Sequence, residues 1–178
     1  PQGYFDGMHT AQLARDKQFT EAADALRPHV SQPNPSTASL VMYGSTLLQS
    51  RRPSLAIWSL ARAAEREDAP PNARTAYLRA LISGGDNLAA IETATAYLEE
   101  NPDHERFLDL RAQAYDAALQ YENALEDLEI LAAENPGTPI LVERILNLLI
   151  QIEDWDGARE RIAELRELLA RDDASPES

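Results

Sequence analysis

The stretch that decides the fold is RAQAYDAALQYENALEDLEILAAENP, residues 111–136. Its larger apolar residues recur three or four positions apart, which is the spacing of one face of a helix. A polar segment around Gln120 separates two short helical patterns, and Asn135-Pro136 ends the second because the residue before a proline disfavours helix. Residues 111–136 therefore predict two helices joined by a tight turn.

The same pattern recurs when the frame is shifted by 34 residues in either direction. Five such frames cover the chain without an insertion: 3–36, 37–70, 71–104, 105–138 and 139–172. One column of the five frames holds only alanine: Ala22, Ala56, Ala90, Ala124 and Ala158. A second column holds large residues: Leu13, Leu47, Leu81, Tyr115 and Leu149. A fixed period of this length is typical of helical repeat arrays.

Both columns have a physical explanation in a pair of packed helices. A small residue is needed where two helices cross closely, and the larger residues fill the space between them. No segment shows the alternation of a strand, so we expect an all-α chain. The first helices of the frames are expected near 4–16, 37–50, 71–84, 105–118 and 139–152. The second helices are expected near 20–31, 54–67, 88–101, 122–135 and 156–171.

Individual frames carry a recognisable set of residues. Frame 37–70 contains Leu40, Tyr43, Gly44, Leu47, Ala56, Leu60, Ala63 and Pro70, and frame 105–138 contains Leu108, Ala112, Tyr115, Ala124, Leu128 and Pro136. This set resembles the tetratricopeptide repeat, although the Trp of that family is absent. The resemblance implies an α-solenoid of antiparallel helix-turn-helix repeats in a right-handed superhelix. It implies a single array over residues 1–172, made of five tandem repeats.

The last frame differs from the others. Arg159 and Arg166 stand in columns that are apolar in the earlier frames, while Ala158, Ile162, Leu165 and Leu169 remain for its own core. A terminal repeat needs a polar outer face, so we expect the array to end here and residues 173–178 to form a flexible tail or linker. Trp58 and Trp155 are interpreted as packing residues rather than as platforms for a ligand.

Composition excludes several classes of function. The chain has no cysteine, which removes disulfides, thiolate metal sites and cysteine nucleophiles. The formal net charge of −14 disfavours nucleic acid and anionic membrane as partners, and no apolar run is long enough to span a membrane. The three histidines, His9, His29 and His104, have no partner at metal-binding or catalytic spacing. We therefore expect no enzyme activity, no cofactor and no metal.

The sequence constrains the cellular compartment less than it constrains the class of function. The chain has one lysine, Lys17, against fifteen arginines, which is typical of a GC-rich bacterial genome. A bacterial soluble compartment, cytoplasm or periplasm, fits both this usage and the absence of cysteine.

The resemblance also implies a binding surface, because first helices line the concave side of such arrays. The candidate groove residues on these helices are Val41, Ser45, Leu48, Gln49, Arg79, Ile82, Arg106, Asp109, Gln113, Asp116, Glu143 and Asn147. Asp109, Asp116 and Glu143 form an expected acidic strip that suits a basic partner residue. Asp109 stands where a chaperone-tail clamp would need a cation, which argues against that ligand.

Three functional hypotheses follow. The first is a non-catalytic protein–protein interaction scaffold that binds a peptide or protein, including a basic one, in the groove. The alternative is an arm of a larger bacterial envelope or polysaccharide-export machine that contacts a cationic glycan or a partner enzyme. The third is self-association through Tyr4, Phe5 or the groove.

Overall fold

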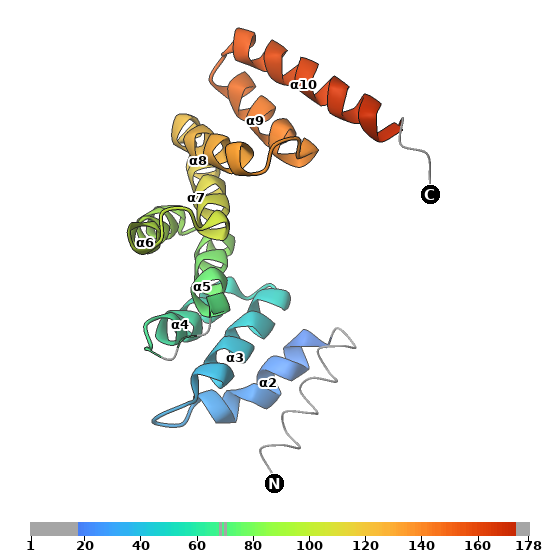
Figure 1. Ribbon diagram of the computed structural model, residues 1–178. Coiled ribbons are helices and arrows are strands. Elements are labelled where there is room, and N and C mark those ends of the chain that lie inside the picture. The colour runs from blue at the N-terminus through green and yellow to red at the C-terminus, as the bar shows by residue number, and fades with distance from the viewer. Residues whose placement is uncertain (1–17, 68, 70, 174–178) are drawn as a thin grey trace. The chain divides into compact units, whose positions relative to one another are not determined.

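Helices account for the secondary structure of the chain. The computed structural model describes residues 18–67, 69 and 71–173, and within this part it contains no strand (Figure 1). The described helices are α2 (Phe19–Val30), α3 (Thr37–Gln49), α4 (Pro53–Ala64), α5 (Pro71–Gly84), α6 (Asn87–Glu100), α7 (Glu105–Ala117), α8 (Tyr121–Glu134), α9 (Pro139–Gln151) and α10 (Trp155–Asp173). The all-α prediction is confirmed. The helix predicted at 4–16, with Tyr4 and Phe5, lies outside the described residues.

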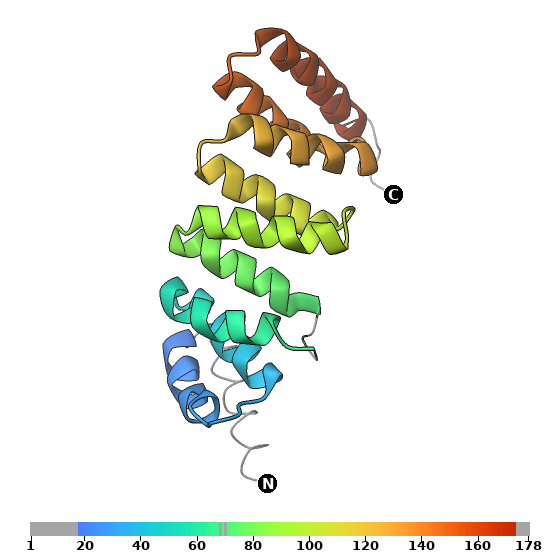
Figure 2. The ribbon, with the colours of Figure 1, turned by 90° about the vertical axis from the view of Figure 1, so that its left-hand side faces the viewer.

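The helices follow the period of the sequence. The first helices of frames two to five begin at 37, 71, 105 and 139, as predicted, and consecutive starts differ by 34 residues. The second helices begin at 19, 53, 87, 121 and 155, each one residue earlier than predicted. Figure 2 shows α7 to α10, coloured from yellow to red, lying side by side in chain order, and neighbours among these helices are in contact.

One type of turn ends the first helix in each of the frames 37–70, 71–104, 105–138 and 139–172. The backbone N–H groups of Arg52, Asp86, Gln120 and Asp154 donate to the carbonyl oxygens of Leu47, Leu81, Tyr115 and Leu149, at 2.8–2.9 Å. The residue before each donor has a positive φ: Arg51 (59°), Gly85 (80°), Leu119 (60°) and Glu153 (59°). This is the Schellman motif, which satisfies carbonyl groups at a helix end and reverses the chain into the second helix.

Small residues allow the two helices of a frame to pack closely. The side chains of Ala22, Ala56, Ala90, Ala124 and Ala158 are 4% exposed or less. Gly44 shows the tightest approach, since a Cβ atom added there would collide with the side chains of Leu60 and Ser59. The prediction that the alanine column marks close helix crossings is therefore confirmed, and the frames share one packing arrangement.

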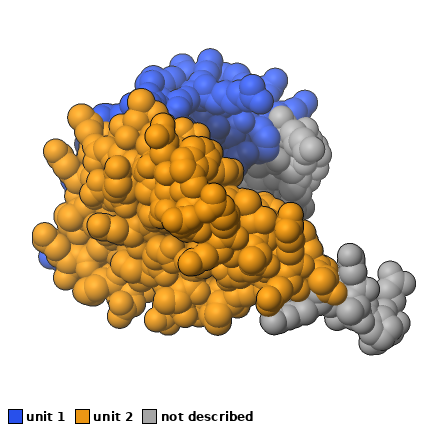
Figure 3. Space-filling model, turned by 90° about the horizontal axis from the view of Figure 1, so that it is seen from above, with its two compact units in different colours: residues 1–86 blue, residues 87–178 orange. Residues whose placement is uncertain are grey.

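The chain divides into two compact units, residues 1–86 and 87–178 (Figure 3). The boundary falls in the turn of the third frame, between α5 and α6. Unit 1 has a core in which Leu47 and Leu60 pack with Ala23, Ala56 and Ala80. The single-array prediction for residues 1–172 stays a prediction, and each unit is described separately below.

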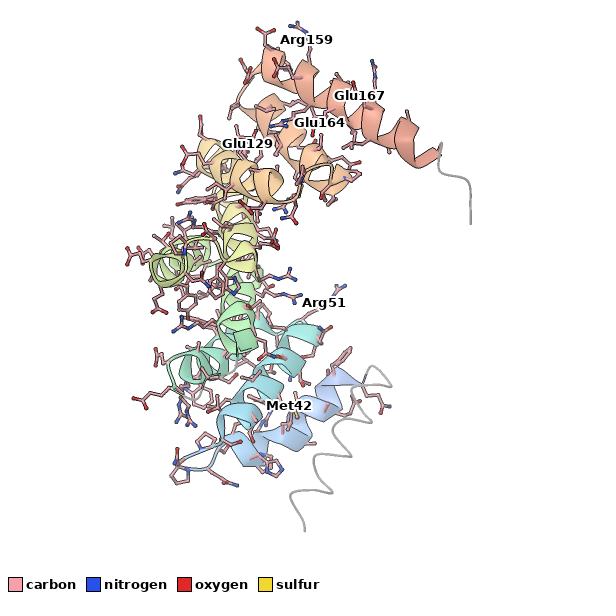
Figure 4. The ribbon with its side chains drawn as sticks, in the orientation of Figure 1. Met42, Arg51, Glu129, Arg159, Glu164 and Glu167 are labelled. Carbon is pink, nitrogen blue, oxygen red and sulfur yellow. The ribbon has the colours of Figure 1, made fainter. Side chains whose placement is uncertain are left out.

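Two arginines tie together helices of unit 2. Arg111 on α7 donates from Nε and Nη2 to the two carboxylate oxygens of Asp127 on α8, at 2.9 and 2.6 Å, and from Nη1 to Thr95 Oγ1 on α6 at 3.2 Å. The hydrogen bond to Asp127 raises the pKa of Arg111 above its ordinary value, against the opposing effect of burial. Arg161 on α10 similarly pairs with Glu129 on α8 and with Glu164. Figure 4 labels Glu129 and Glu164 on these two helices.

Several apolar side chains that were predicted to pack are exposed. Trp58 is 50% exposed and Trp155 is 55% exposed, so their interpretation as packing residues was wrong. Trp155 is the first residue of α10. Ile162 and Leu169 on α10 are 37% and 51% exposed, so the predicted core of the last frame is smaller than expected.

Candidate protein-interaction groove

Half of the predicted groove residues lie in unit 1, on two helices that contact each other. Val41, Ser45, Leu48 and Gln49 are on α3, and Arg79 and Ile82 are on α5. Gln49 and Arg79 are exposed, while Ser45, Leu48 and Ile82 are half-buried. Val41 differs from the prediction: it is 9% exposed and belongs to a core cluster. That cluster also contains Val30, Leu40, Ala63 and Ala73, so the Val41 side chain is occupied by internal packing.

The other half lie on two first helices of unit 2. Arg106, Asp109, Gln113 and Asp116 recur at i, i+3, i+7 and i+10 on α7 and therefore share a face. Glu143 and Asn147 are one turn apart on α9. A direct side-chain contact joins the two helices, since Arg144 Nη1 on α9 donates to Asp109 Oδ1 on α7 at 2.7 Å. We call the surface formed by α7 and α9 the α7–α9 groove.

Two pockets open on the α7–α9 groove. The larger pocket, of about 630 Å³, is lined by Arg106 and Asp109 together with His104, Asn135, Thr138 and Ile140. The smaller pocket, of about 250 Å³, is lined by Asp116 and Asn147 together with Tyr121, Arg144 and Gln151. Four of the six residues predicted here thus line a pocket. Gln113 and Glu143 are exposed and line neither.

The Asp109–Arg144 pair changes the electrostatics that the sequence predicted. Asp109 lines the larger pocket and Arg144 the smaller one, so the pair lies between them. In addition, Arg106 Nη1 lies 3.6 Å from Asp109 Oδ2. The negative charge of Asp109 is therefore compensated by two arginines of its own chain. The Asp116 side chain has no hydrogen bond or ion pair within the described part of the chain. Asp116 and Asp103, which line the smaller and the larger pocket, are therefore carboxylates without an ion pair in the described part of the chain.

The larger pocket combines polar groups with an apolar wall. The His104 ring stacks on Phe107, with centroids 3.9 Å apart, and its buried Nδ1 atom has no hydrogen-bond partner. Asn135 Nδ2 donates to the carbonyl oxygen of Leu131 at 3.2 Å. Ile140 is 60% exposed and supplies apolar surface. Pockets that hold orienting polar groups within apolar surroundings are typical of binding sites.

The described part of the chain offers no cluster of metal ligands in this groove. Among residues 18–67, 69 and 71–173, no group of three or more His, Cys, Asp or Glu side chains is placed to hold a metal ion. No helix in the same part of the chain is long and apolar enough to cross a membrane.

Sequence reasoning missed the residue that organises the groove. Arg144 is 35 positions from Asp109, which is one frame plus one residue. In an array with a period of 34, residues at this separation lie on neighbouring first helices. A search for opposite charges one frame plus one residue apart would have found the pair.

Comparisons with known proteins bear on the fold. No protein-family model and no curated protein matches this chain. Solved structures do match: a MamA RS-1 double mutant has 16% sequence identity, a TM-score of 0.81 and 97% coverage of both chains. MamA from Desulfovibrio magneticus RS-1, from residue 41 to its end, has 16% identity and a TM-score of 0.80, and covers 94% of this chain and 95% of its own. A crystal structure of MamA has 18% identity and a TM-score of 0.78, and covers 93% and 97%. At these identities the similarity shows a shared helical-repeat fold.

Proposed function

We propose that this chain is a non-catalytic protein-interaction scaffold whose α7–α9 groove binds a peptide segment of a partner protein. The observation that carries the proposal is the pair of pockets on either side of the Asp109–Arg144 pair. Two pockets on neighbouring helices suit consecutive side chains of one bound segment. The helical-repeat fold shared with the MamA structures supports a scaffold of this kind.

The chemistry of the two pockets defines the segment. Leu131, Ile140 and Leu141 of the larger pocket suit an apolar side chain. Asp116, in the smaller pocket, suits a lysine or arginine, since its side chain forms no ion pair within the described chain and Arg144 of the same pocket is paired with Asp109. The formal net charge of −14 draws a basic partner toward the surface and speeds association at low salt.

The first prediction tests this groove by charge reversal. Asp116→Lys should weaken binding at least about tenfold, because it replaces the carboxylate that meets the cation of the segment. The ligands are peptides selected on the natural chain from a displayed library of random linear sequences, then synthesised and measured by fluorescence anisotropy. Binding by the natural chain should weaken as salt rises, because screening shortens the range of the attraction.

Glu160→Lys on α10 is the matched control. It makes the same charge change at an exposed carboxylate that lines neither pocket. The proposal fails if the selected peptides lack basic residues, or if Asp116→Lys and Glu160→Lys bind them equally well.

A further inference from the structure

A pocket in unit 1 lies outside the surface that first helices form. It has a volume of about 230 Å³ and is lined mainly by α2 and α4, with Val30, Tyr43, Leu55 and Trp58 as its apolar residues. Leu55 is 55% exposed and Trp58 is 50% exposed. We call it the α2–α4 pocket. Leu55, Trp58 and Arg62 follow at i, i+3 and i+7, so they share one face of α4.

The repeat itself shows that Trp58 is not needed for folding. The equivalent positions of the other four frames hold carboxylates: Asp24, Glu92, Glu126 and Glu160. The position of Leu55 is likewise variable, being occupied elsewhere by Glu21, Ala89, Asn123 and Gly157. A helical repeat of this type therefore packs without large apolar residues at these two positions. Their exposure in frame 37–70 has to be explained by something other than the core.

Charge indicates what would cover the pocket. The Arg62 guanidinium lies over the Trp58 ring, 5.0 Å from its centre, and no carboxylate pairs with Arg62 in the described part of the chain. Residues 1–86 contain nine Lys and Arg against eight Asp and Glu, a net charge of +1. Residues 87–178 contain seven against twenty-two, a net charge of −15. The net negative charge of the chain thus comes from residues 87–178, and the net charge of unit 1 does not repel an acidic segment.

We propose that the α2–α4 pocket is a second docking site, for an acidic peptide segment of a partner protein. A large apolar side chain of that segment packs against Leu55 and Trp58, and a neighbouring carboxylate pairs with Arg62. Tryptophan and arginine are the residues that most often dominate binding energy at interfaces, and a cation held over an indole is already positioned for an anion. This site is separate from the α7–α9 groove and takes a ligand of opposite charge.

Trp58→Glu is the central test, and the chain itself shows that glutamate is tolerated at this position, in Glu92, Glu126 and Glu160. A displayed library of random linear peptides is first depleted on Trp58→Glu and then selected on the natural chain. The selected peptides should carry Asp or Glu next to Leu, Phe or Trp. Their synthetic versions should bind Trp58→Glu at least about tenfold more weakly than the natural chain. Arg62→Gln should also weaken them and reduce the dependence of binding on salt.

Two controls separate this site from other surfaces. Ile130→Glu on α8 removes an apolar side chain that is 45% exposed, at a position where the last frame carries Glu164. It should leave binding unchanged, as should Asp116→Lys in the α7–α9 groove. The last result keeps the two proposals independent, because either site can fail alone.

Three results would overturn the proposal. The first is a selection that yields no peptide specific for the natural chain. The second is a set of selected peptides that are basic. The third is concentration-dependent mass in light scattering that Trp58→Glu abolishes, since the occupant would then be a second copy of this chain.

Discussion

At the scale of single residues, the turns after α3, α5, α7 and α9 each place one residue at a positive φ, and only one of these four residues is glycine. Gly85 suits this conformation, but Arg51, Leu119 and Glu153 do not, because a side chain disfavours left-handed backbone by about 1–2 kcal/mol. Leu119 is 71% exposed, so its side chain contributes little packing in return. The turn geometry is held here by its hydrogen bonds and by the helices on either side.

Leu119→Gly is therefore predicted to stabilise the protein. Glycine removes the backbone strain but adds freedom to the unfolded chain, so we expect a net gain of about 0.5–1 kcal/mol in the free energy of unfolding. The measurement is a urea titration followed by circular dichroism. Leu119→Ala separates the loss of the side chain from the effect of φ, and it should change stability much less than glycine does. A glycine variant no more stable than the alanine variant would refute this explanation.

At single positions, the sequence predicted those features that the same residue type marks in every frame. It missed the features that different residue types share. The alanine column was predictable because close helix crossings impose the same demand on every frame. Arg51, Leu119 and Glu153 gave no local signal of positive φ, because that conformation is normally recognised by glycine. Val41 and Trp58 were misassigned for one reason: frame position indicates a direction on a helix, whereas burial depends on which neighbours cover that direction.

At the scale of helices, the Arg111–Asp127 pair connects α7 to α8 inside unit 2. Its side chains are 18% and 3% exposed. Removing one partner from a buried pair leaves the other charge without compensation, which costs more than the pair contributed. The Asp156–Arg159 pair on α10 is the opposite case, because its side chains are 91% and 74% exposed.

Asp127→Ala is predicted to lower the free energy of unfolding by about 3 kcal/mol, near the lower end for buried pairs because Arg111 keeps some access to water. Thermal and urea unfolding measure this loss. Asp156→Ala is the surface control and should change stability by less than about 1 kcal/mol. The double variant Arg111→Met/Asp127→Leu should recover much of the loss, because it leaves no buried charge. If the double variant is as unstable as Asp127→Ala, unpaired charge is not the cause.

Helix boundaries were more predictable than side-chain partners. The first helices begin where the sequence placed them because the period, the turn and the proline signals agree at each boundary. Arg111–Asp127 and Asp109–Arg144 join residues 16 and 35 positions apart, and only the second separation is related to the 34-residue period. The sequence predicted which residues share the groove face of α7. It did not predict that the charge of Asp109 is compensated by Arg144 from the next frame.

At the scale of the whole molecule, contacts run mainly between helices that are neighbours in the chain. In unit 1 they join α2 to α3, α3 to α4 and α4 to α5, with a further contact between α3 and α5. In unit 2 they join α6 to α7, α7 to α8, α8 to α9 and α9 to α10. Stability in such an arrangement is approximately a sum of local terms, so a defect should be felt mainly by its neighbours.

Leu60→Ala tests this locality. Leu60 is fully buried in α4, and its truncation should cost about 2–5 kcal/mol locally. Amide hydrogen exchange, measured by mass spectrometry, should accelerate in α3, α4 and α5 and change little in α8, α9 and α10. Exposed Leu88→Ala, at the start of α6, is the control and should leave exchange unchanged in all six of these helices. Equal acceleration throughout the chain would show instead that it unfolds as one cooperative unit.

The turn that closes α3, α5, α7 and α9 also divides the chain into equivalent repeat units of 34 residues. Helix starts, left-handed residues and closing hydrogen bonds all recur at the same 34-residue interval, so a cut after residue 138 falls at the same point of the repeat as one after 104. A second copy of residues 105–138 spliced in there would pack against residues 139–172 through the face that the first copy now uses, and against the first copy through the equivalent surface of the repeat. Gene duplication could therefore lengthen such a protein one frame at a time, and each added frame would bring new side chains for recognition without disturbing the packing of the old ones.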